Sequence, residues 1–313
     1  MAIHAEHGGL GSGPHAVCPI CGCRSFSKFR FGLLRCSECG LVIDAVAIAE
    51  AHDAALQTEW FGTPEAARSP WVRKFEAWND ARTCARIRRF VQPPARVLEI
   101  GLGSGSLLAE LRRVGFDVQG CDLSPEVGKY VSGVLGIPVF VGPIAEFSAT
   151  ASFDVVVMNH VVEHTSDPIR LLNDARRLAK PGALFHIKAP NVASWNAHLP
   201  GWTSYEPYHL VYFSKESLAE AVKRAGLTCL EVSTYEPFSG WFLAALRTAV
   251  GRRLQHAPGR EKARRARSNG VEHAYRASML AAGAALYPLR RLQSRLGAGE
   301  EIVLLATAPN HAP

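Results

Sequence analysis

The hydrophobic positions of this chain alternate, from residue 95 onward, between short apolar runs and segments with helical spacing. The short runs predict strands at Val97–Ile100, Asp117–Cys121, Val139–Val141, Phe153–Met158, Ala183–Ala189, Thr228–Tyr235 and Glu301–Ala306. The helical spacing predicts helices at Ser106–Val114, Pro125–Leu135, Pro168–Leu178 and Lys215–Ala225. Strands that alternate with helices are typical of an α/β fold with a largely parallel sheet.

The bulk composition is ordinary for a globular protein. The chain has 313 residues, of which 48% are hydrophobic and 20% charged. No apolar run reaches the roughly 18 residues of a spanning helix, and the N-terminus lacks a basic region followed by an apolar one. We therefore expect a soluble, cytoplasmic protein.

Five of the eight cysteines lie within Cys18–Cys39. Four of them form two C-x-x-C pairs, Cys18/Cys21 and Cys36/Cys39, and a glycine follows each pair. In a chain without a secretory signal, this spacing predicts a structural zinc site with four thiolate ligands. The segment resembles a zinc ribbon over residues 17–45 with a short hairpin between the pairs, and Cys23 is a spare thiol.

The first predicted strand contains the acid Glu99. It is followed by three alternating glycines, Gly101, Gly103 and Gly105. A second acid, Asp122, ends the next strand about 20 residues later, where it can accept hydrogen bonds from a ribose. This pattern predicts a nucleotide-type cofactor held where backbone can approach it closely. A dinucleotide fingerprint would need glycine where this chain has Ser106.

The Glu99–Gly105 stretch instead resembles motif I of the class I S-adenosylmethionine (SAM) methyltransferases. Phe153–His164 and Lys180–Leu184 extend the resemblance, over about residues 95–235, to the branch of ubiquinone-type O-methyltransferases and sugar methyltransferases. It implies a seven-stranded, doubly wound, Rossmann-like sheet with the last strand antiparallel. It also implies a SAM-binding set: Glu99, Gly101, Gly103, Gly105, Asp122, Leu123 and Asn159.

The strand that ends at Asn159 is followed by His160-x-x-Glu163-His164, which also spells the H-x-x-E-H pattern of inverted zinc proteases. Its position after a buried strand of a SAM-type sheet argues against a protease. In ubiquinone-type relatives, acids and a histidine here are linked to a divalent cation, and His160 stands in place of the first acid. Glu163 and His164 therefore either bind a cation or fix the loop, and His160 faces the methyl group.

Ser204–Ser214 resembles the segment of zinc-bearing deoxysugar C-methyltransferases in which a tyrosine and a histidine flank the acceptor. The resemblance implies His209 as the catalytic base, with Tyr205 or Tyr208 orienting the substrate; a histidine suits proton removal near neutral pH. The alternative is that His209 only packs the loop. We expect no counterpart of the additional C-terminal domain that the larger sugar enzymes carry.

The net charge of +7 comes from one region. Between Gly240 and Ala298 stand 12 Arg and Lys residues against Glu261 and Glu272. Such a basic helical insertion can contact an anionic membrane surface, hold nucleic-acid phosphates, or simply cover the core.

These observations predict a division into a disordered tail (1–16), the zinc ribbon (17–45), a helical connector (46–92), the SAM-binding core (93–237), the basic helical insertion (238–299), and the last core strand with a tail (300–313). The expected activity is SAM-dependent methyl transfer to a small or carrier-linked metabolite: a sugar, polyketide or quinone-like acceptor. The alternatives are an RNA methyltransferase that grips RNA through the ribbon and the insertion, and a non-catalytic SAM-binding adaptor.

Overall fold

The computed structural model describes residues 16–50, 70–148, 152–205, 208–237, 240–249 and 285–310. The predicted tail up to residue 15 and the densest part of the basic insertion, which includes Arg260–Arg267, lie outside the described residues.

The central feature is a seven-stranded sheet of order β10-β11-β8-β7-β4-β5-β6. Its strands are β4 (Arg96–Ile100), β5 (Asp117–Asp122), β6 (Val139–Val141), β7 (Phe153–Asn159), β8 (Ala179–Pro190), β10 (Thr228–Tyr235) and β11 (Glu301–Thr307). The five strands from β4 to β8 pair in parallel, whereas β11 pairs antiparallel with both β8 and β10. The α/β fold class and the antiparallel insertion of the last strand are thereby confirmed.

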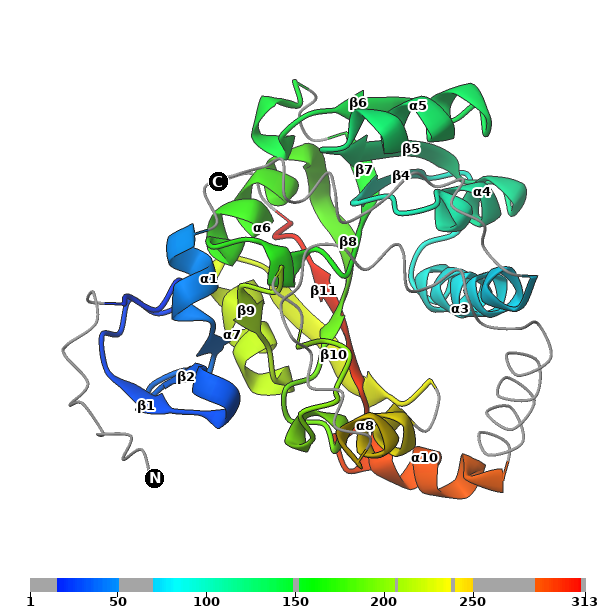
Figure 1. The fold of residues 1–313 in the computed structure, drawn as a ribbon. Coiled ribbons are helices and arrows are strands. Elements are labelled where there is room, and N and C mark those ends of the chain that lie inside the picture. Colours follow the sequence, from blue (N-terminus) through cyan, green and yellow to red (C-terminus); the bar gives the residue numbers. More distant parts are fainter. Residues whose placement is uncertain are drawn as a thin grey trace, which may run out of the picture.

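Helices cover both faces of this sheet (Figure 1). On one face lie α6 (Pro168–Leu178) and α7 (Lys215–Arg224); on the other lie α3 (Pro70–Arg88), α4 (Ser106–Arg113) and α5 (Pro125–Gly133). Successive side chains of β7 point to opposite faces of the sheet. Val156 and Met158 pack in the core under α6 and α7, and Val155 and Val157 pack in the core under α3 and α4. Both helical layers thus pack on β7, a central strand whose residues Val155–Met158 are buried.

Local signals fix where the helices start. Ser124 caps α5 by accepting from the Val127 amide, and Asp167 caps α6 by accepting from the Arg170 amide. A proline follows each cap, at a position where its missing N–H leaves no hydrogen bond unmade. A capping box at Ser214 and Ser217 starts α7.

A second, four-stranded sheet has the order β1-β2-β3-β9. It joins β1 (Phe26–Lys28), β2 (Leu34–Cys36) and β3 (Val42–Ile43) of the N-terminal segment to β9 (Val211–Tyr212) of the core. The predicted hairpin is the β1–β2 pair. The short helix α1 (Ala45–Glu50) follows β3, and this N-terminal part shares a hydrophobic core with α6, α7 and the large sheet. The N-terminal part is therefore integrated into the core rather than tethered to it (Figure 1).

Two helices of the predicted insertion precede β11: α8 (Gly240–Ala249) and α10 (Tyr287–Arg295). In the part of the chain that the structure describes, no helix is both long and apolar enough to cross a membrane.

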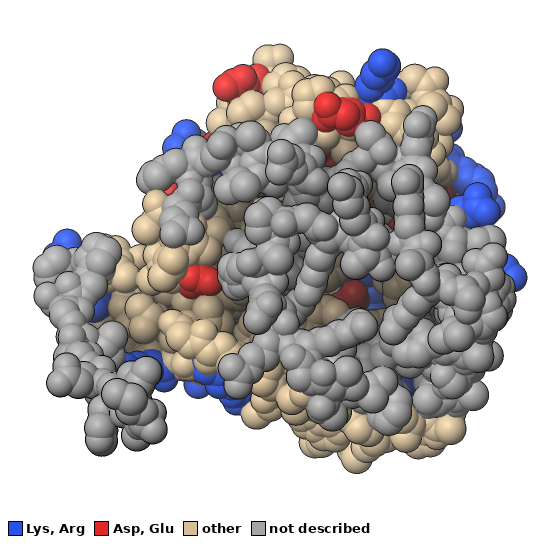
Figure 2. Space-filling model, viewed as in Figure 1, with Lys and Arg blue, Asp and Glu red and all other residues tan. Residues whose placement is uncertain are grey.

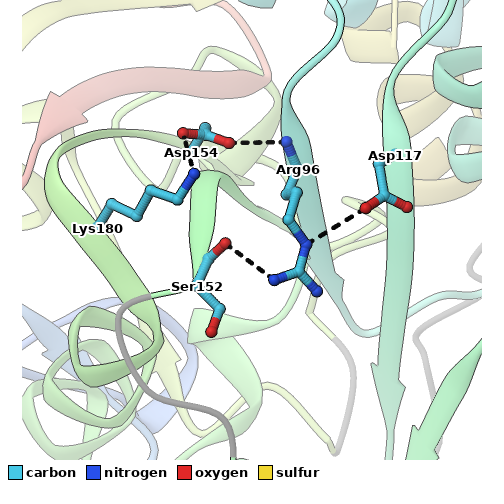
Figure 3. Close-up of polar contacts among 5 residues, drawn as sticks. All are labelled: Arg96, Asp117, Ser152, Asp154 and Lys180. Atoms are coloured by element: carbon cyan, nitrogen blue, oxygen red, sulfur yellow. Dashed lines mark hydrogen bonds and ion pairs between the residues drawn. The ribbon is translucent and has the colours of Figure 1, made fainter.

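The amino ends of the parallel strands are tied together by an ion-pair network (Figure 3). Asp154 accepts from the Arg96 amide and the Lys180 ammonium, each at 2.8 Å. The Arg96 guanidinium bonds Asp117 and the Ser152 carbonyl, both at 3.3 Å. These contacts join β4, β5, β7 and β8 at the sheet edge away from the glycine-rich turn.

Candidate active site

The glycine-rich turn between β4 and α4 has the backbone geometry that only glycine adopts easily. Gly101 and Gly105 have φ values of 76° and 71°. An added Cβ would lie 2.6 Å from Val161 Cγ2 at Gly101, and 2.8 Å from Val131 Cγ2 at Gly105. At Gly103 it would meet no atom within 4 Å. The turn is therefore packed from behind and open at its middle glycine, as a ligand cradle requires.

Asp122 connects this turn to the next one. Its carboxylate accepts from the Leu102 amide at 2.7 Å and from the Ser124 amide at 2.8 Å. Burial raises the pKa of Asp122 despite these bonds. Each carboxylate oxygen keeps a lone pair for a ligand hydroxyl. Beside it, the Leu123 side chain is about half exposed and offers an apolar contact.

Buried acids surround the carboxyl end of β4. Burial, with the charges of Asp80 and Asp122, raises the pKa of Glu99 well above its ordinary value. Within the described structure, Glu99 Oε2 and Asn159 Oδ1 are buried without a hydrogen-bond partner. Such atoms are costly unless something is bound to them. A cationic ligand with hydrogen-bond donors, such as the methionyl part of SAM, fits this set.

Asp80 is a candidate site residue that the sequence did not reveal. It comes from α3, which lies outside the motif-bearing segments, and its side chain is buried beside Glu99. The neighbouring Asn79 accepts a 2.8 Å hydrogen bond from Lys188 on β8. The only available signal was an Asn-Asp pair within a helical segment rich in arginine.

His160 leaves β7 with a positive φ of 57°, which is strained for a non-glycine residue. Its Nδ1 lies 3.3 Å from Glu163 Oε1 and its Nε2 3.4 Å from Glu301 Oε1. Burial opposes the charged ring, but the two carboxylates outweigh it and raise the pKa of His160 to about 10. The imidazole is therefore a cation at neutral pH and is unsuited to accept a proton there.

His209 has the opposite character. Its ring is buried, and burial lowers its pKa to about 4, so it is neutral at pH 7. Its Nδ1 lies 2.7 Å from the Ser204 carbonyl oxygen. Because a carbonyl only accepts, Nδ1 carries the hydrogen and Nε2 carries the lone pair. His209 thus presents a neutral, fixed tautomer whose Nε2 can bind a metal or accept a proton. Its lowered pKa makes it a weaker base than the near-neutral histidine that the sequence predicts.

Glu163, His164 and His209 form a compact cluster in which one ligand atom from each lies within 4.8 Å of the others. The His164 Nδ1 donates to the Tyr208 carbonyl at 3.0 Å, and the rings of His164 and His209 are 4.7 Å apart. Two imidazoles and one carboxylate suit a divalent transition metal. The cluster can therefore serve either as a proton-accepting site or as a metal site.

The two predicted tyrosines have different surroundings. The Tyr205 hydroxyl donates to the Ala197 carbonyl at 2.6 Å, and burial raises its pKa to about 12. Arg30 also interacts with the Tyr205 side chain and partly offsets this rise. Tyr208 lies next to His209 and holds His164 through its backbone.

The four predicted zinc ligands come together. Sγ atoms lie 3.5 Å apart in the Cys18–Cys39 pair and 3.4 Å apart in the Cys21–Cys36 pair, and all four lie within 4.8 Å of one another. Thiolates at 2.3 Å from a tetrahedral zinc would stand about 3.8 Å apart. Burial opposes ionisation of Cys36, but the Cys39 and Glu38 amides outweigh it and lower its pKa to about 7. This donor set fits zinc.

The four-cysteine module is linked directly to the His209 segment, which the sequence did not predict. Strand β3 pairs antiparallel with β9, so that Ile43 faces Val211. The Asp44 amide donates to the Leu210 carbonyl at 3.0 Å, and the Leu210 amide donates to the Glu163 carbonyl at 2.9 Å. The residue next to His209 is thus held between the ribbon and the β7 exit loop.

Comparison with known proteins decides the family. Residues 75–232, just over half of the chain, match the family model of a methyltransferase domain. The chain belongs to the class I SAM-dependent methyltransferases.

Its relatives include ubiquinone biosynthesis O-methyltransferases. The one from Methylobacterium sp. (strain 4-46) is 32% identical over 171 residues, which cover 49% of this chain and 69% of the relative. The one from Xanthomonas campestris pv. campestris (strain B100) is 29% identical over 145 residues, which cover 44% of this chain and 59% of the relative. The match thus leaves about a third or more of each relative unmatched.

Among solved structures, the Burkholderia thailandensis 1,6-didemethyltoxoflavin-N1-methyltransferase, determined with S-adenosylhomocysteine, has a similar fold. Its TM-score is 0.50 at 16% identity, and the match covers 91% of this chain and 99% of that structure. This neighbour confirms the fold, and the family match and the relatives named above show SAM-dependent methyl transfer.

Proposed function

We propose that this methyltransferase acts on a small or carrier-linked metabolite with a sugar, polyketide or quinone-like acceptor, and that His209 removes the acceptor proton. The observation that carries the proposal is the Nδ1 hydrogen bond of His209 to the Ser204 carbonyl. It leaves the Nε2 lone pair as the basic site of a buried, neutral imidazole.

The other candidate residues bind the cofactor, orient the acceptor or position charged groups near that base. When bound, SAM supplies an electrophilic methyl group. Glu99, Asp122 and Asn159 hold the cofactor over the glycine turn, and Tyr205 and Tyr208 orient the acceptor beside His209. His160, a cation between Glu163 and Glu301, keeps those two carboxylates ionised and in place. Alignment of acceptor and methyl group, together with proton removal, then lowers the barrier.

A divalent cation at Glu163, His164 and His209 is the competing role for the same cluster. A bound cation would use the lone pair of His209 and would instead lower the pKa of an acceptor hydroxyl. The four cysteines hold a structural zinc ion in either case.

We further propose a cytoplasmic enzyme whose basic insertion (238–299) contacts the inner membrane surface. A net charge of +10 over Gly240–Ala298 supports attraction to anionic lipid. This contact would suit a lipid-linked acceptor.

The first test is titration of zinc-quantified protein with S-adenosylhomocysteine, with Asp122→Ala as the site variant and Asp117→Ala as the matched control. Asp117 is also an aspartate of β5, but it is the first residue of this strand, whereas Asp122 is the last. We expect micromolar binding that only Asp122→Ala abolishes.

The second test is transfer of a deuterated methyl group from SAM to three acceptor panels: phenolic quinone precursors, nucleotide-linked sugars and structured RNA. Labelling of a small-molecule panel supports the proposal. Labelling of RNA alone would overturn it in favour of the RNA alternative, and tight cofactor binding without any turnover would favour an adaptor.

A further inference from the structure

A cavity of about 570 Å³ lies between α3, the end of β10 and α10. Five arginines line it: Arg82 and Arg86 from α3, and Arg290, Arg291 and Arg295 from α10. We call this cavity the arginine pocket. Figure 2 shows Lys and Arg residues at several places on one face of the molecule.

The arginine pocket contains little negative charge of its own. Among the described residues that line it, the one acid is Glu236, whose Oε1 accepts from the Gly240 amide at 3.1 Å and whose Oε2 accepts from Gln293 at 2.9 Å. Burial raises the pKa of Glu236 to about 8, so this acid is largely neutral at pH 7. Among the described lining residues, five guanidinium groups thus face one acid that is largely neutral.

Aromatic rings hold two of these guanidinium groups. Arg82 lies 4.3 Å from the Tyr235 ring centroid and 4.9 Å from that of Trp78. Arg291 lies 5.8 Å from the Tyr287 centroid. Stacking on a ring engages the face of a guanidinium and leaves its N–H edges available. Within the described structure, Arg82, Arg86, Arg291 and Arg295 form no hydrogen bond or ion pair.

The pocket borders the active site. Strand β10 runs in the same direction as β8, so its last residue, Tyr235, lies at the edge where the parallel strands end. Tyr235 pairs with Glu301, whose charge acts on Arg86 and whose Oε1 lies 3.4 Å from His160 Nε2. Glu301 thus lies between the pocket and the pair formed by His160 and Glu163.

We propose that the arginine pocket binds the phosphate or diphosphate of a phosphate-linked acceptor and thereby directs the attached acceptor group toward His209. Guanidinium forks match phosphate oxygens with paired, charge-assisted hydrogen bonds. The proposal deepens the proposed function, on which it rests, by naming the acceptor as a diphosphate ester. A nucleoside diphosphate and a polyprenyl diphosphate share this chemistry.

The test is calorimetric titration of the full-length, zinc-loaded enzyme with inorganic pyrophosphate. The variant R82Q/R295Q removes two charges from the pocket, and Arg113→Gln, on the exposed face of α4, is the matched control. We expect the pocket variant to weaken pyrophosphate binding by at least about tenfold and the control to leave it unchanged. S-Adenosylhomocysteine affinity should stay unchanged in both, which also shows that the variants are folded.

Two further arms identify the source of the phosphate. Tighter binding of UDP than of pyrophosphate would indicate a nucleotide carrier, whereas arginine-dependent co-sedimentation with vesicles containing a polyprenyl diphosphate would indicate a lipid carrier. Pyrophosphate binding that R82Q/R295Q leaves intact, or no binding of any probe by protein that binds S-adenosylhomocysteine, would overturn the proposal. Loss of S-adenosylhomocysteine binding with intact pyrophosphate binding would instead contradict the proposed cofactor site.

Discussion

In the seven-stranded sheet, the end at which the parallel strands start (the amino edge) and the end at which they finish (the carboxyl edge) use polar residues in opposite ways. At the amino edge, Asp154 is satisfied by the Arg96 amide and the Lys180 ammonium (Figure 3). At the carboxyl edge, Glu99 and Asn159 keep buried oxygens without a partner in the described structure. Satisfied groups stabilise the fold, whereas unsatisfied buried groups cost stability and persist where a ligand must be received. The difference favours the carboxyl edge as the reactive one.

The largest effect is expected from His209→Gln, which removes the base while keeping a polar side chain. We expect kcat to fall by about 10²–10⁴-fold with S-adenosylhomocysteine affinity unchanged, because proton removal and cofactor binding use different residues. His198→Gln is the matched control, since the His198 Nδ1 also bonds a backbone carbonyl, that of Ser194. An unchanged kcat in His209→Gln would assign that histidine to packing alone.

Loss of zinc should have the next largest effect, because the ribbon supports the segment that carries His209. Cys36→Ser is expected to lower kcat by about a hundredfold through misplacement of the base, while cofactor affinity changes little. The control is Cys23→Ser, since Cys23 lies outside the four-cysteine cluster. Full activity in zinc-free protein, verified by metal analysis, would show that β9 keeps its position without the ribbon.

The large sheet was predictable because its strands and helices carry strong periodic signals and ordered motifs. All seven predicted strands and the four predicted core helices are present, with ends that differ by a few residues. The pairing of β3 with β9 was not predictable, because strands of two residues leave no periodic pattern and their partners lie far apart in sequence.

The candidate site was predictable to the extent that its residues follow strands. Glu99, Asp122 and His160 stand at strand ends, where a parallel sheet brings side chains together. Asp80 and Glu301 escaped notice, because a helix before the core and the start of an antiparallel strand carry no motif. Their proximity depends on packing and sheet order rather than on local sequence.

The dependence of the unfolding free energy on pH tests the charge of His160 at the carboxyl edge. The pKa of His160, about 10 in the folded protein, lies above its unfolded value of about 6.5. The stabilisation from its protonation is therefore complete below pH 6.5 and is lost as the pH rises through 10. Because 42% of the His160 side chain is exposed to solvent, which screens its charge, we expect this stabilisation to be about 1–2 kcal/mol.

His160→Gln should flatten this part of the curve of unfolding free energy against pH, as measured by urea denaturation from pH 6 to pH 10.5. His198→Gln should keep the shape of the wild-type curve. If His160→Gln and the wild type lost stability in parallel over this range, the cationic state of His160 would be refuted.

The smallest effect is expected at the amino edge, from Asp154→Asn. Burial opposes ionisation of Asp154, but Lys180 and the Arg96 amide outweigh it and lower its pKa. Its contribution to stability is therefore present above the unfolded pKa of about 3.9 and is lost as the pH falls through the folded value. We expect Asp154→Asn to cost about 1 kcal/mol at pH 7 in urea denaturation and to leave kcat unchanged. Asp117→Asn, whose side chain is 70% exposed, should cost less than about 0.5 kcal/mol. A fall in kcat for Asp154→Asn at full cofactor affinity would break the division between a structural and a reactive edge, because it would couple the two ends of β7.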